Sequence, residues 1–344
     1  MSSSTSGKKL KKVVTFGEVL LRLSPPDNLR LSQADTFSAV YGGSELNVAI
    51  SLANFGLPVD FVTRLPENKL AKSAVMEMHK YGVSSENIVY GGDRLGLYFI
   101  EVGAGLRGSS VVYDRQFSAM TTIEKGMINW EEVFADAQWF HWSGITAGIS
   151  NSAAEVCSEA IEVAEKMGLT ISTDFNYRAN LWKYDKSPQE IMEPMIAKCD
   201  VVLAGEYACA QYFGIKPIHS HVHQSLAQQL ESRFPKLKYV AITHREMISA
   251  THNKWSAVLY NKKEELLHST VYDITDIVDR IGAGDSFMAG LIYGLIALDD
   301  DHKALDFAVA ASALKHTIYG DANLASVEEV ENLTSGDLGG LVKR

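Results

Sequence analysis

The chain has 344 residues, of which 46% are hydrophobic and 22% are charged. This is enough apolar material for one large α/β domain or two ordinary ones. The formal net charge of -10 opposes electrostatic capture of nucleic acid or of an anionic membrane, because phosphate groups select clustered Lys and Arg. We therefore expect a small-molecule partner, with no nucleic acid and no membrane.

Cysteine usage and the first residues indicate where the protein works. The three cysteines, Cys157, Cys199 and Cys209, form no Cys-x-x-Cys pair and have no His at zinc-site spacing, so reduced cytoplasmic thiols are expected. Residues 1–12 are rich in Ser and Lys and lack the apolar stretch of a secretory signal, which predicts a disordered leader. The apolar segment 290–298 falls short of the roughly 20 residues that cross a bilayer.

Short β-branched runs alternate with helical patterns along the chain. The predicted strands are 13–16, 59–62, 169–172, 201–203 and 239–242. The predicted helices are 45–55, 69–81, 152–167, 191–198 and 225–233. This alternation predicts an α/β fold with a doubly wound, mostly parallel sheet flanked by helices, and ligands at the carboxyl ends of its strands.

One stretch breaks the alternation. Residues 97–100 and 110–113 look like two strands joined by a Gly-rich link, which predicts a hairpin instead of a crossover. With strands from about 18–40, the segment of about 95–117 would form a small β-sheet lid over the site. We predict one domain over 13–335 with this lid, whose open edge offers a place for self-association.

A glycine-rich turn near the carboxyl end precedes an apolar helical run. It contains Gly282, Ala283, Gly284 and Asp285. Backbone amides and the positive end of a helix can hold a phosphoryl group, and a carboxylate there can accept the proton of an attacking hydroxyl. Taken alone, the pattern fits a structural helix cap equally well.

Two longer motifs resolve that ambiguity. Residues 279–290 match the pattern Asp-x-x-Gly-Ala-Gly-Asp-x-Phe-x-x-Gly, and residues 42–49 contain a Gly-Gly pair followed by Asn-x-Ala. In both respects the chain resembles the ribokinase-like (PfkB-type) carbohydrate kinases, over nearly its whole length. The resemblance implies the ribokinase-like fold and sugar phosphorylation with ATP and Mg²⁺ as cofactors.

The resemblance also implies roles for individual residues. Asp285 would be the general base, and the amides of Gly282, Ala283 and Gly284 would form the anion hole and contact the nucleotide's phosphate. Gly43 and Asn47 would touch the sugar, and Thr243 would contact the nucleotide. An ordinary polar helix face for Asn47 and a solvated strand end for Thr243 are the alternatives.

One family feature is absent from the sequence. An Asn-x-x-Glu motif, or a related acidic stretch, usually follows the strand represented here by 201–204, where this chain has Gly205 and Glu206. The resemblance therefore leaves open how Mg²⁺ is organised, and we assign no direct protein ligand to the metal.

Within the family the chain is most similar to the 2-keto-3-deoxygluconate kinases, in the segments 113–115, 174–178 and 315–321. This implies an acid sugar as the substrate. Arg115 and Arg178 would hold its carboxylate, because the guanidinium fork matches a carboxylate with two hydrogen bonds. Tyr98 and Tyr113 would offer hydroxyls, and Asp321 would bind a sugar hydroxyl.

Other interpretations stay open at this point. The arginines would otherwise form surface ion pairs, and the tyrosines would occupy alternate positions of a half-buried strand. Kinase activity on fructose, ribose or 5-dehydro-2-deoxygluconate is the nearest alternative. A catalytically silent sugar-binding sensor on the same scaffold is an alternative from a different class.

Overall fold

The computed structural model describes residues 11–218, 221–263 and 265–336. Most of the predicted leader, residues 1–10, lies outside the described residues. Its last residue, Lys12, already belongs to strand β1 (Lys12–Phe16). No helix within the described ranges is long and apolar enough to cross a membrane.

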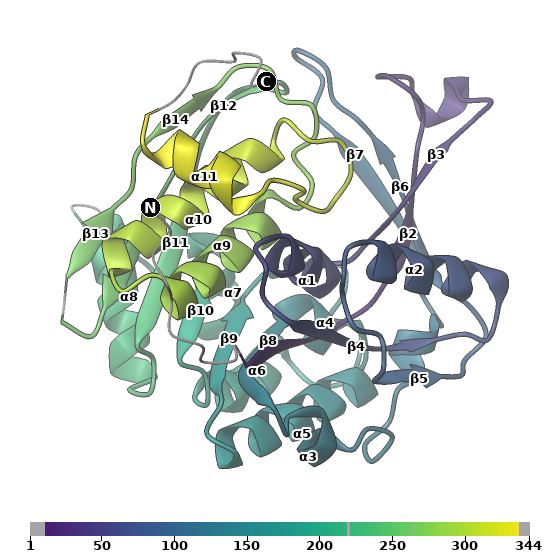
Figure 1. Ribbon diagram of the computed structural model, residues 1–344, viewed down its shortest axis with the longest axis horizontal. Coiled ribbons are helices and arrows are strands. Elements are labelled where there is room, and N and C mark those ends of the chain that lie inside the picture. Colours follow the sequence, from purple (N-terminus) through teal and green to yellow (C-terminus); the bar gives the residue numbers. More distant parts are fainter. Residues whose placement is uncertain (1–10, 219–220, 264, 337–344) are drawn as a thin grey trace, which may run out of the picture.

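A mostly parallel sheet of ten strands runs through the centre of the molecule (Figure 1). Its order is β13-β12-β11-β10-β9-β8-β1-β4-β5, with β14 paired to β12. The strands from β11 to β5 pair in parallel, whereas β12 pairs antiparallel with β11, β13 and β14. The strands besides β1 are β4 (Val59–Leu65), β5 (Ile88–Tyr90), β8 (Ala137–Ser143), β9 (Thr170–Asp174), β10 (Val201–Leu203), β11 (Tyr239–Ser249), β12 (His252–Asn261), β13 (Leu266–His268) and β14 (Tyr272–Ile274).

Helices bury both faces of this sheet, each against its own apolar core. One face is covered by α3 (Trp130–Val133), α4 (Gly144–Ile149), α5 (Asn151–Lys166), α6 (Pro188–Ile196), α7 (Glu206–Phe213) and α8 (Val222–Arg233). The other is covered by α1 (Ser44–Asn54), α2 (Lys69–Lys80), α9 (Ala283–Ala297), α10 (Asp301–Lys315) and α11 (Val327–Thr334). The predicted doubly wound, mostly parallel sheet is confirmed.

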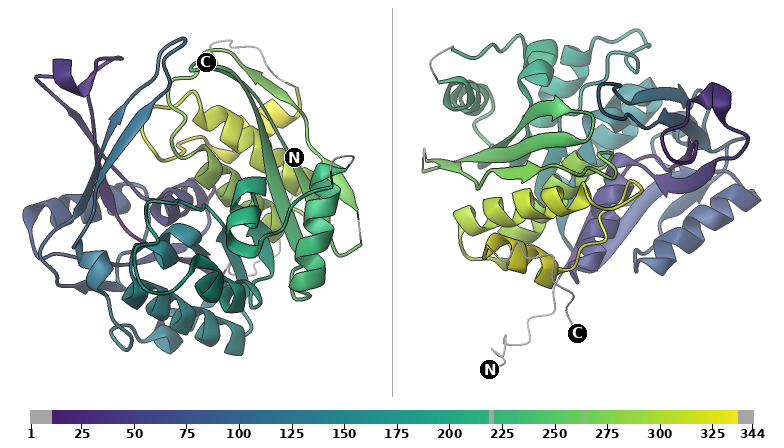
Figure 2. Two further views of the ribbon diagram at one scale, coloured as in Figure 1. Left: turned by 180° about the vertical axis from the view of Figure 1, so that it is seen from behind. Right: turned by 90° about the horizontal axis from the view of Figure 1, so that it is seen from above.

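A separate four-stranded sheet projects from the central one (Figures 1 and 2). It contains β2 (Leu20–Ser24), β3 (Ser38–Gly42), β6 (Gly96–Glu101) and β7 (Ser110–Asp114), in the order β3-β2-β6-β7. The predicted hairpin is confirmed, since β6 and β7 pair antiparallel with Tyr98 opposite Tyr113. Short 3₁₀ turns lie at Leu31–Gln33 and Ala119–Thr122.

The strand order fixes where a ligand can bind. The chain proceeds outward from β1 to β4 and β5 on one side, and from β8 through β9 and β10 to β11 on the other. Neighbouring β1 and β8 therefore form a point where the direction of winding reverses. In such sheets the crevice lies outside the carboxyl ends of the strands at this point.

Candidate active site

A cavity of about 510 Å³ lies at that edge, bounded by residues of the central sheet and of the lid sheet. Every site residue predicted from the sequence lines it: Gly43, Asn47, Tyr98, Tyr113, Arg115, Arg178, Thr243, Gly282, Ala283, Gly284, Asp285 and Asp321. Another cavity, of about 650 Å³, lies beside α8, but none of its described lining residues carries a carboxylate. The convergence of acids, arginines and a glycine turn makes the first cavity the candidate active site.

The glycine turn forms the start of α9, with Gly282 as the residue before the helix. Gly282 has a φ of 79°, and a Cβ there would lie 1.8 Å from the carbonyl oxygen of Asp321. Only glycine fits this place. The amides of Gly282 and Gly284 have no hydrogen-bond partner within the described residues, whereas that of Ala283 donates to the Arg280 carbonyl over 3.4 Å. The turn therefore presents free donors to the cavity at a helix N-terminus.

Asp285 is buried in the first turn of α9 and is held by the start of α1. Its Oδ1 accepts a hydrogen bond of 2.7 Å from Ser44 Oγ, and its Oδ2 accepts one of 2.7 Å from Asn47 Nδ2. Burial raises the pKa of Asp285, and these two hydrogen bonds act in the opposite direction. The carboxylate is thereby fixed in orientation and made more basic than an exposed aspartate.

Asn47 meets the cavity with a second polar atom. Its Oδ1 is buried and has no hydrogen-bond partner among the described residues. A buried acceptor without a partner is costly unless a ligand supplies a donor. Gly43, just before α1, has a φ of 150°, and a Cβ there would lie 2.1 Å from the Glu18 carbonyl oxygen. The backbone at Gly43 therefore packs against the backbone at Glu18 too closely for any side chain.

Three further acids of the cavity, Glu18, Glu45 and Asp174, were missed from the sequence as site residues. Burial raises the pKa of Asp174 to about 7, and the neighbouring charge of Asp285 adds to the effect. Burial likewise raises the pKa of Glu45, although Ser143 and Thr146 donate hydrogen bonds to its Oε1. Asp174 could have been found because it ends a strand, where parallel sheets place their functional groups.

The arginines of the cavity differ in their partners. Arg115 is buried and forms an ion pair with Glu18, its Nε donating to Oε2 over 2.8 Å. Its charge is thus neutralised by the protein itself. The side chains of Arg178 and Arg245 are exposed, and their guanidinium groups have no ion-pair or hydrogen-bond partner in the described part of the chain. Arg280 donates to the main-chain carbonyls of Ser249 and Ala250.

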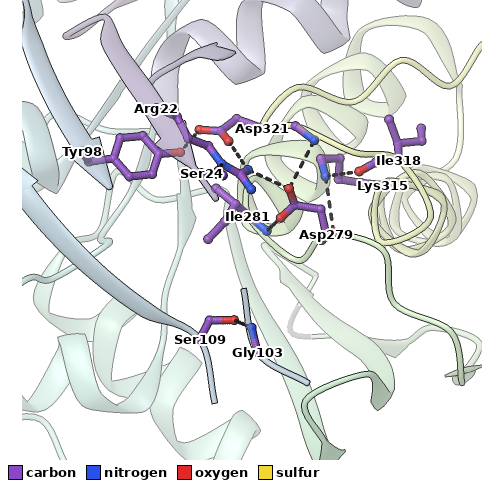
Figure 3. A network of polar contacts seen from close by, with 11 residues as sticks. Arg22, Ser24, Tyr98, Gly103, Ser109, Asp279, Ile281, Lys315, Ile318 and Asp321 are labelled. Carbon is purple, nitrogen blue, oxygen red and sulfur yellow. Dashed lines mark hydrogen bonds and ion pairs between the residues drawn. The ribbon is translucent and has the colours of Figure 1, made fainter. Parts of the chain in front are cut away.

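The lid contributes Tyr98 and Tyr113, whose rings lie 5.8 Å apart. The Tyr98 hydroxyl donates to Asp321 Oδ2, and Arg22 Nη1 donates to Asp321 Oδ1 over 2.8 Å (Figure 3). Both carboxylate oxygens of Asp321 therefore already have protein partners. Tyr113 is exposed, and Thr243 lies where β11 leaves the buried part of the sheet.

Gly205 and Glu206 lie apart from these groups. Gly205 precedes α7, Glu206 is its first residue, both are exposed, and neither lines the cavity. Over residues 11–218, 221–263 and 265–336, no group of three or more His, Cys, Asp or Glu could hold a metal ion by itself.

Comparison with known proteins shows the family to which the chain belongs. Residues 10–327 match the model of the pfkB family of carbohydrate kinases, so the chain belongs to this family and is a sugar kinase. A 2-dehydro-3-deoxygluconokinase of Thermotoga maritima has a solved structure that is 43% identical, with a TM-score of 0.91, over 95% of this chain and 100% of that one.

Two curated relatives are named as kinases of similar sugar acids. A 2-dehydro-3-deoxygalactonokinase of Haloferax volcanii is 32% identical over 95% of this chain and 98% of its own length. A 5-dehydro-2-deoxygluconokinase of Geobacillus thermodenitrificans is 26% identical over 83% of this chain and 80% of its own length. The chain is thus a kinase close to those of the 2-keto-3-deoxy sugar acids.

Proposed function

We propose that the protein transfers the γ-phosphoryl group of ATP to 2-keto-3-deoxygluconate, which is also called 2-dehydro-3-deoxygluconate, giving 2-keto-3-deoxy-6-phosphogluconate and ADP. The observation on which the acid-sugar assignment depends is the exposed, unpartnered guanidinium of Arg178 in the same cavity as the buried carboxylate of Asp285. The names of the relatives at 43% and 32% identity support it.

Asp285 is the general base of the proposed reaction. It accepts the proton of the terminal sugar hydroxyl as that oxygen attacks the γ-phosphorus and the bond to the departing ADP oxygen breaks. The hydrogen bonds from Ser44 and Asn47 occupy one acceptor position on each oxygen, which leaves further lone pairs for the substrate. The raised pKa strengthens the carboxylate as a proton acceptor.

The turn at Gly282–Gly284 is the proposed anion hole. Its free amides at the start of α9 stabilise the negative charge that spreads over the transferred phosphoryl oxygens. Mg²⁺, when bound, neutralises charge on the nucleotide's phosphates. An ion held mainly by phosphate oxygens and water fits a site whose described residues offer no cluster of protein ligands. Asp174, whose Oδ2 lies 4.0 Å from the position of a Cβ added to Gly284, is the carboxylate beside the proposed anion hole.

The sugar acid lies between Arg178 and the lid in this proposal. Arg178 binds the carboxylate, while the Arg115–Glu18 ion pair forms a charge-neutral wall and offers Arg115 for a hydrogen bond. Asn47 Oδ1 accepts from a sugar hydroxyl, and Gly43, which lines the same cavity, contacts the sugar through its backbone. Tyr98, Tyr113 and Asp321 complete the sugar side, and Thr243 and Arg245 lie on the nucleotide side.

The test is release of ADP from Mg-ATP by the purified protein, with a panel of acceptors. The panel contains 2-keto-3-deoxygluconate, 2-keto-3-deoxygalactonate, 5-dehydro-2-deoxygluconate, gluconate, fructose and ribose. We expect the 2-keto-3-deoxy acids to be the best substrates. Preference for fructose or ribose would refute the acid-sugar assignment, and sugar binding without turnover of any acceptor would support a sensor instead.

Two variants assign the roles. Asp285→Asn keeps the shape but not the base, and we expect kcat to fall by about 10² to 10⁴-fold. Arg178→Gln removes a charge-assisted contact, and we expect KM for the acid sugar to rise by about 10 to 100-fold with KM for ATP unchanged. Lys183→Gln, an exposed charge that does not line the cavity, is the matched control for Arg178.

A further inference from the structure

Lys315 is the most unusual charged residue outside the proposed chemistry. It is the last residue of α10, and its side chain is fully buried. Lysine is almost never fully buried unless its ammonium has partners. Here Nζ donates to the carbonyl oxygen of Ile318 over 2.9 Å and lies 3.4 Å from the carbonyl oxygen of Asp279 (Figure 3). The second carbonyl belongs to the first residue of the glycine-turn motif.

Asp279 connects that motif to the rest of the molecule. Its Oδ1 accepts a hydrogen bond of 3.0 Å from the amide of Ile281, the residue before Gly282, and its Oδ2 accepts one of 3.2 Å from the amide of Gly320. Oδ2 also forms an ion pair of 2.6 Å with the fully buried Arg22 of the lid strand β2. Asp279 thus fixes the start of the glycine turn through both its backbone and its side chain.

With Asp279 and Asp321 both ionised, the charges of this network balance only when Lys315 is protonated. Arg22 lies between Asp279 and Asp321, and these two carboxylates outnumber the one guanidinium. The ammonium of Lys315 supplies the second positive charge. A neutral amine would leave an excess negative charge in a buried place, and it would have fewer N–H groups to donate to the two carbonyls.

We propose that the protonated side chain of Lys315 is a positioning residue for catalysis, which holds the Asp279 carbonyl and hence the phosphate-binding turn in its active geometry. The inference rests on the proposed role of the turn at Gly282–Gly284. It predicts that phosphoryl transfer requires the ammonium form. The glycine turn would relax when that ammonium loses its proton or is replaced by an uncharged group.

Titration of Lys315 falls in an accessible range. Burial lowers its pKa from the ordinary 10.5 to about 8. Three neighbouring carboxylates favour the ammonium form, and one guanidinium opposes it: Asp279, Asp321 and Asp285 on one side, and Arg22 on the other. Between pH 8 and 10.5 the unfolded chain binds a proton that the folded protein has released, so this residue's contribution to stability rises with pH. The proposed activity falls over the same range. For a purely structural lysine, the activity would not fall over the pH range in which its contribution to stability rises.

The experiment compares Lys315→Met, which keeps the volume without the charge, Lys315→Arg, which keeps a charge that does not titrate, and Lys303→Met, an exposed control on the same helix. We expect Lys315→Met to lower kcat by about 10²-fold, the effect of a displacement of about 1 Å in an active site, without changing KM for the sugar. Wild-type kcat should fall above pH 8, while kcat of Lys315→Arg stays level.

A second measurement needs no acceptor sugar. The affinity for a non-hydrolysable ATP analogue, by calorimetry, should fall above pH 8 in the wild type and should be reduced at all pH values in Lys315→Met. Methylammonium should restore part of the activity of Lys315→Ala, because it fits the vacated space and replaces the charge.

The outcomes are separable. A wild type that turns over no sugar would contradict the proposed function, and the analogue affinities would still decide the role of Lys315. Equal kcat and equal analogue affinity in Lys315→Met and Lys303→Met would overturn the inference while leaving the kinase intact. If no variant at 315 folds, a wild-type analogue affinity that stays constant from about pH 8 to about pH 10 overturns it.

Discussion

Replacing Gly282 by alanine should test whether the position of the phosphate-binding turn controls phosphoryl transfer. The new Cβ would lie 1.8 Å from the Asp321 carbonyl oxygen, about 1.6 Å short of the 3.4 Å at which ordinary contact begins. The obstacle is backbone, so no side-chain rotation can relieve it. The φ of 79° adds strain of its own, because this region is unfavourable for a residue with a Cβ.

The magnitude follows from these two effects. The left-handed conformation costs roughly 1 to 2 kcal/mol, and overpacking adds roughly 1 to 3 kcal/mol, so the free energy of unfolding should fall by roughly 2 to 5 kcal/mol. If the turn moves by about 1 Å or more to make room, kcat should fall by about 10²-fold or more, because catalysis is that sensitive to misplacement.

Gly168→Ala is the matched control for this prediction. Gly168 has a φ of 74°, but a Cβ added to it would meet nothing within 4 Å, and the residue does not line the cavity. This variant should lose only the conformational part of the stability, with kcat unchanged. Urea unfolding and steady-state ADP release measure both variants. Equal kcat in the two variants would refute the reasoning that the position of the turn controls phosphoryl transfer.

Three further outcomes are expected. Arg22→Met leaves the carboxylates of Asp279 and Asp321 buried without the Arg22 guanidinium. The free energy of unfolding, measured by urea titration, should fall by about 3 to 5 kcal/mol. An unchanged midpoint of urea unfolding would contradict this prediction. Burial raises the pKa of Asp174 to about 7, so its contribution to stability is present below pH 3.8 and lost as the pH rises to 7. Over that range Asp174→Asn should therefore gain stability relative to the wild type. A stability difference that stays constant with pH would be inconsistent with the burial argument. Arg245→Gln should raise KM for ATP by about tenfold and leave KM for the sugar unchanged, because the unpartnered guanidinium loses one charge-assisted contact; the reverse pattern would place it on the sugar side.

The sequence predicted the fold well because its signals are local. Runs such as 201–203 and the helical spacing of 152–167 depend on neighbouring residues, and both elements were found within a residue or two. The antiparallel strands β12 to β14 were not predicted. The glycine turn and the Gly-Gly pair were recognisable because backbone conformations that need glycine leave a mark in the sequence.

Pairing between distant side chains was not predictable in the same way. Arg115 looked like a carboxylate anchor, but its partner Glu18 lies 97 positions earlier in the chain. Arg22 and Asp321 are 299 positions apart. Which charges meet depends on how the lid docks on the sheet, and no periodicity encodes that choice. The sugar-binding roles, the domain limits and self-association through the lid remain predictions.

The attachment of Arg22 and Tyr98 to Asp321 also limits how the lid can move. Strands β2 and β6 are tied midway along their length to the loop that adjoins the phosphate-binding turn. A rigid rotation of the whole lid would break the buried ion pairs of Arg22, so we expect any movement on sugar binding to occur in the parts of the strands beyond these contacts. We therefore expect the outer end of the β6–β7 hairpin to be the part of the lid that moves, while the inner half keeps its position on the central sheet.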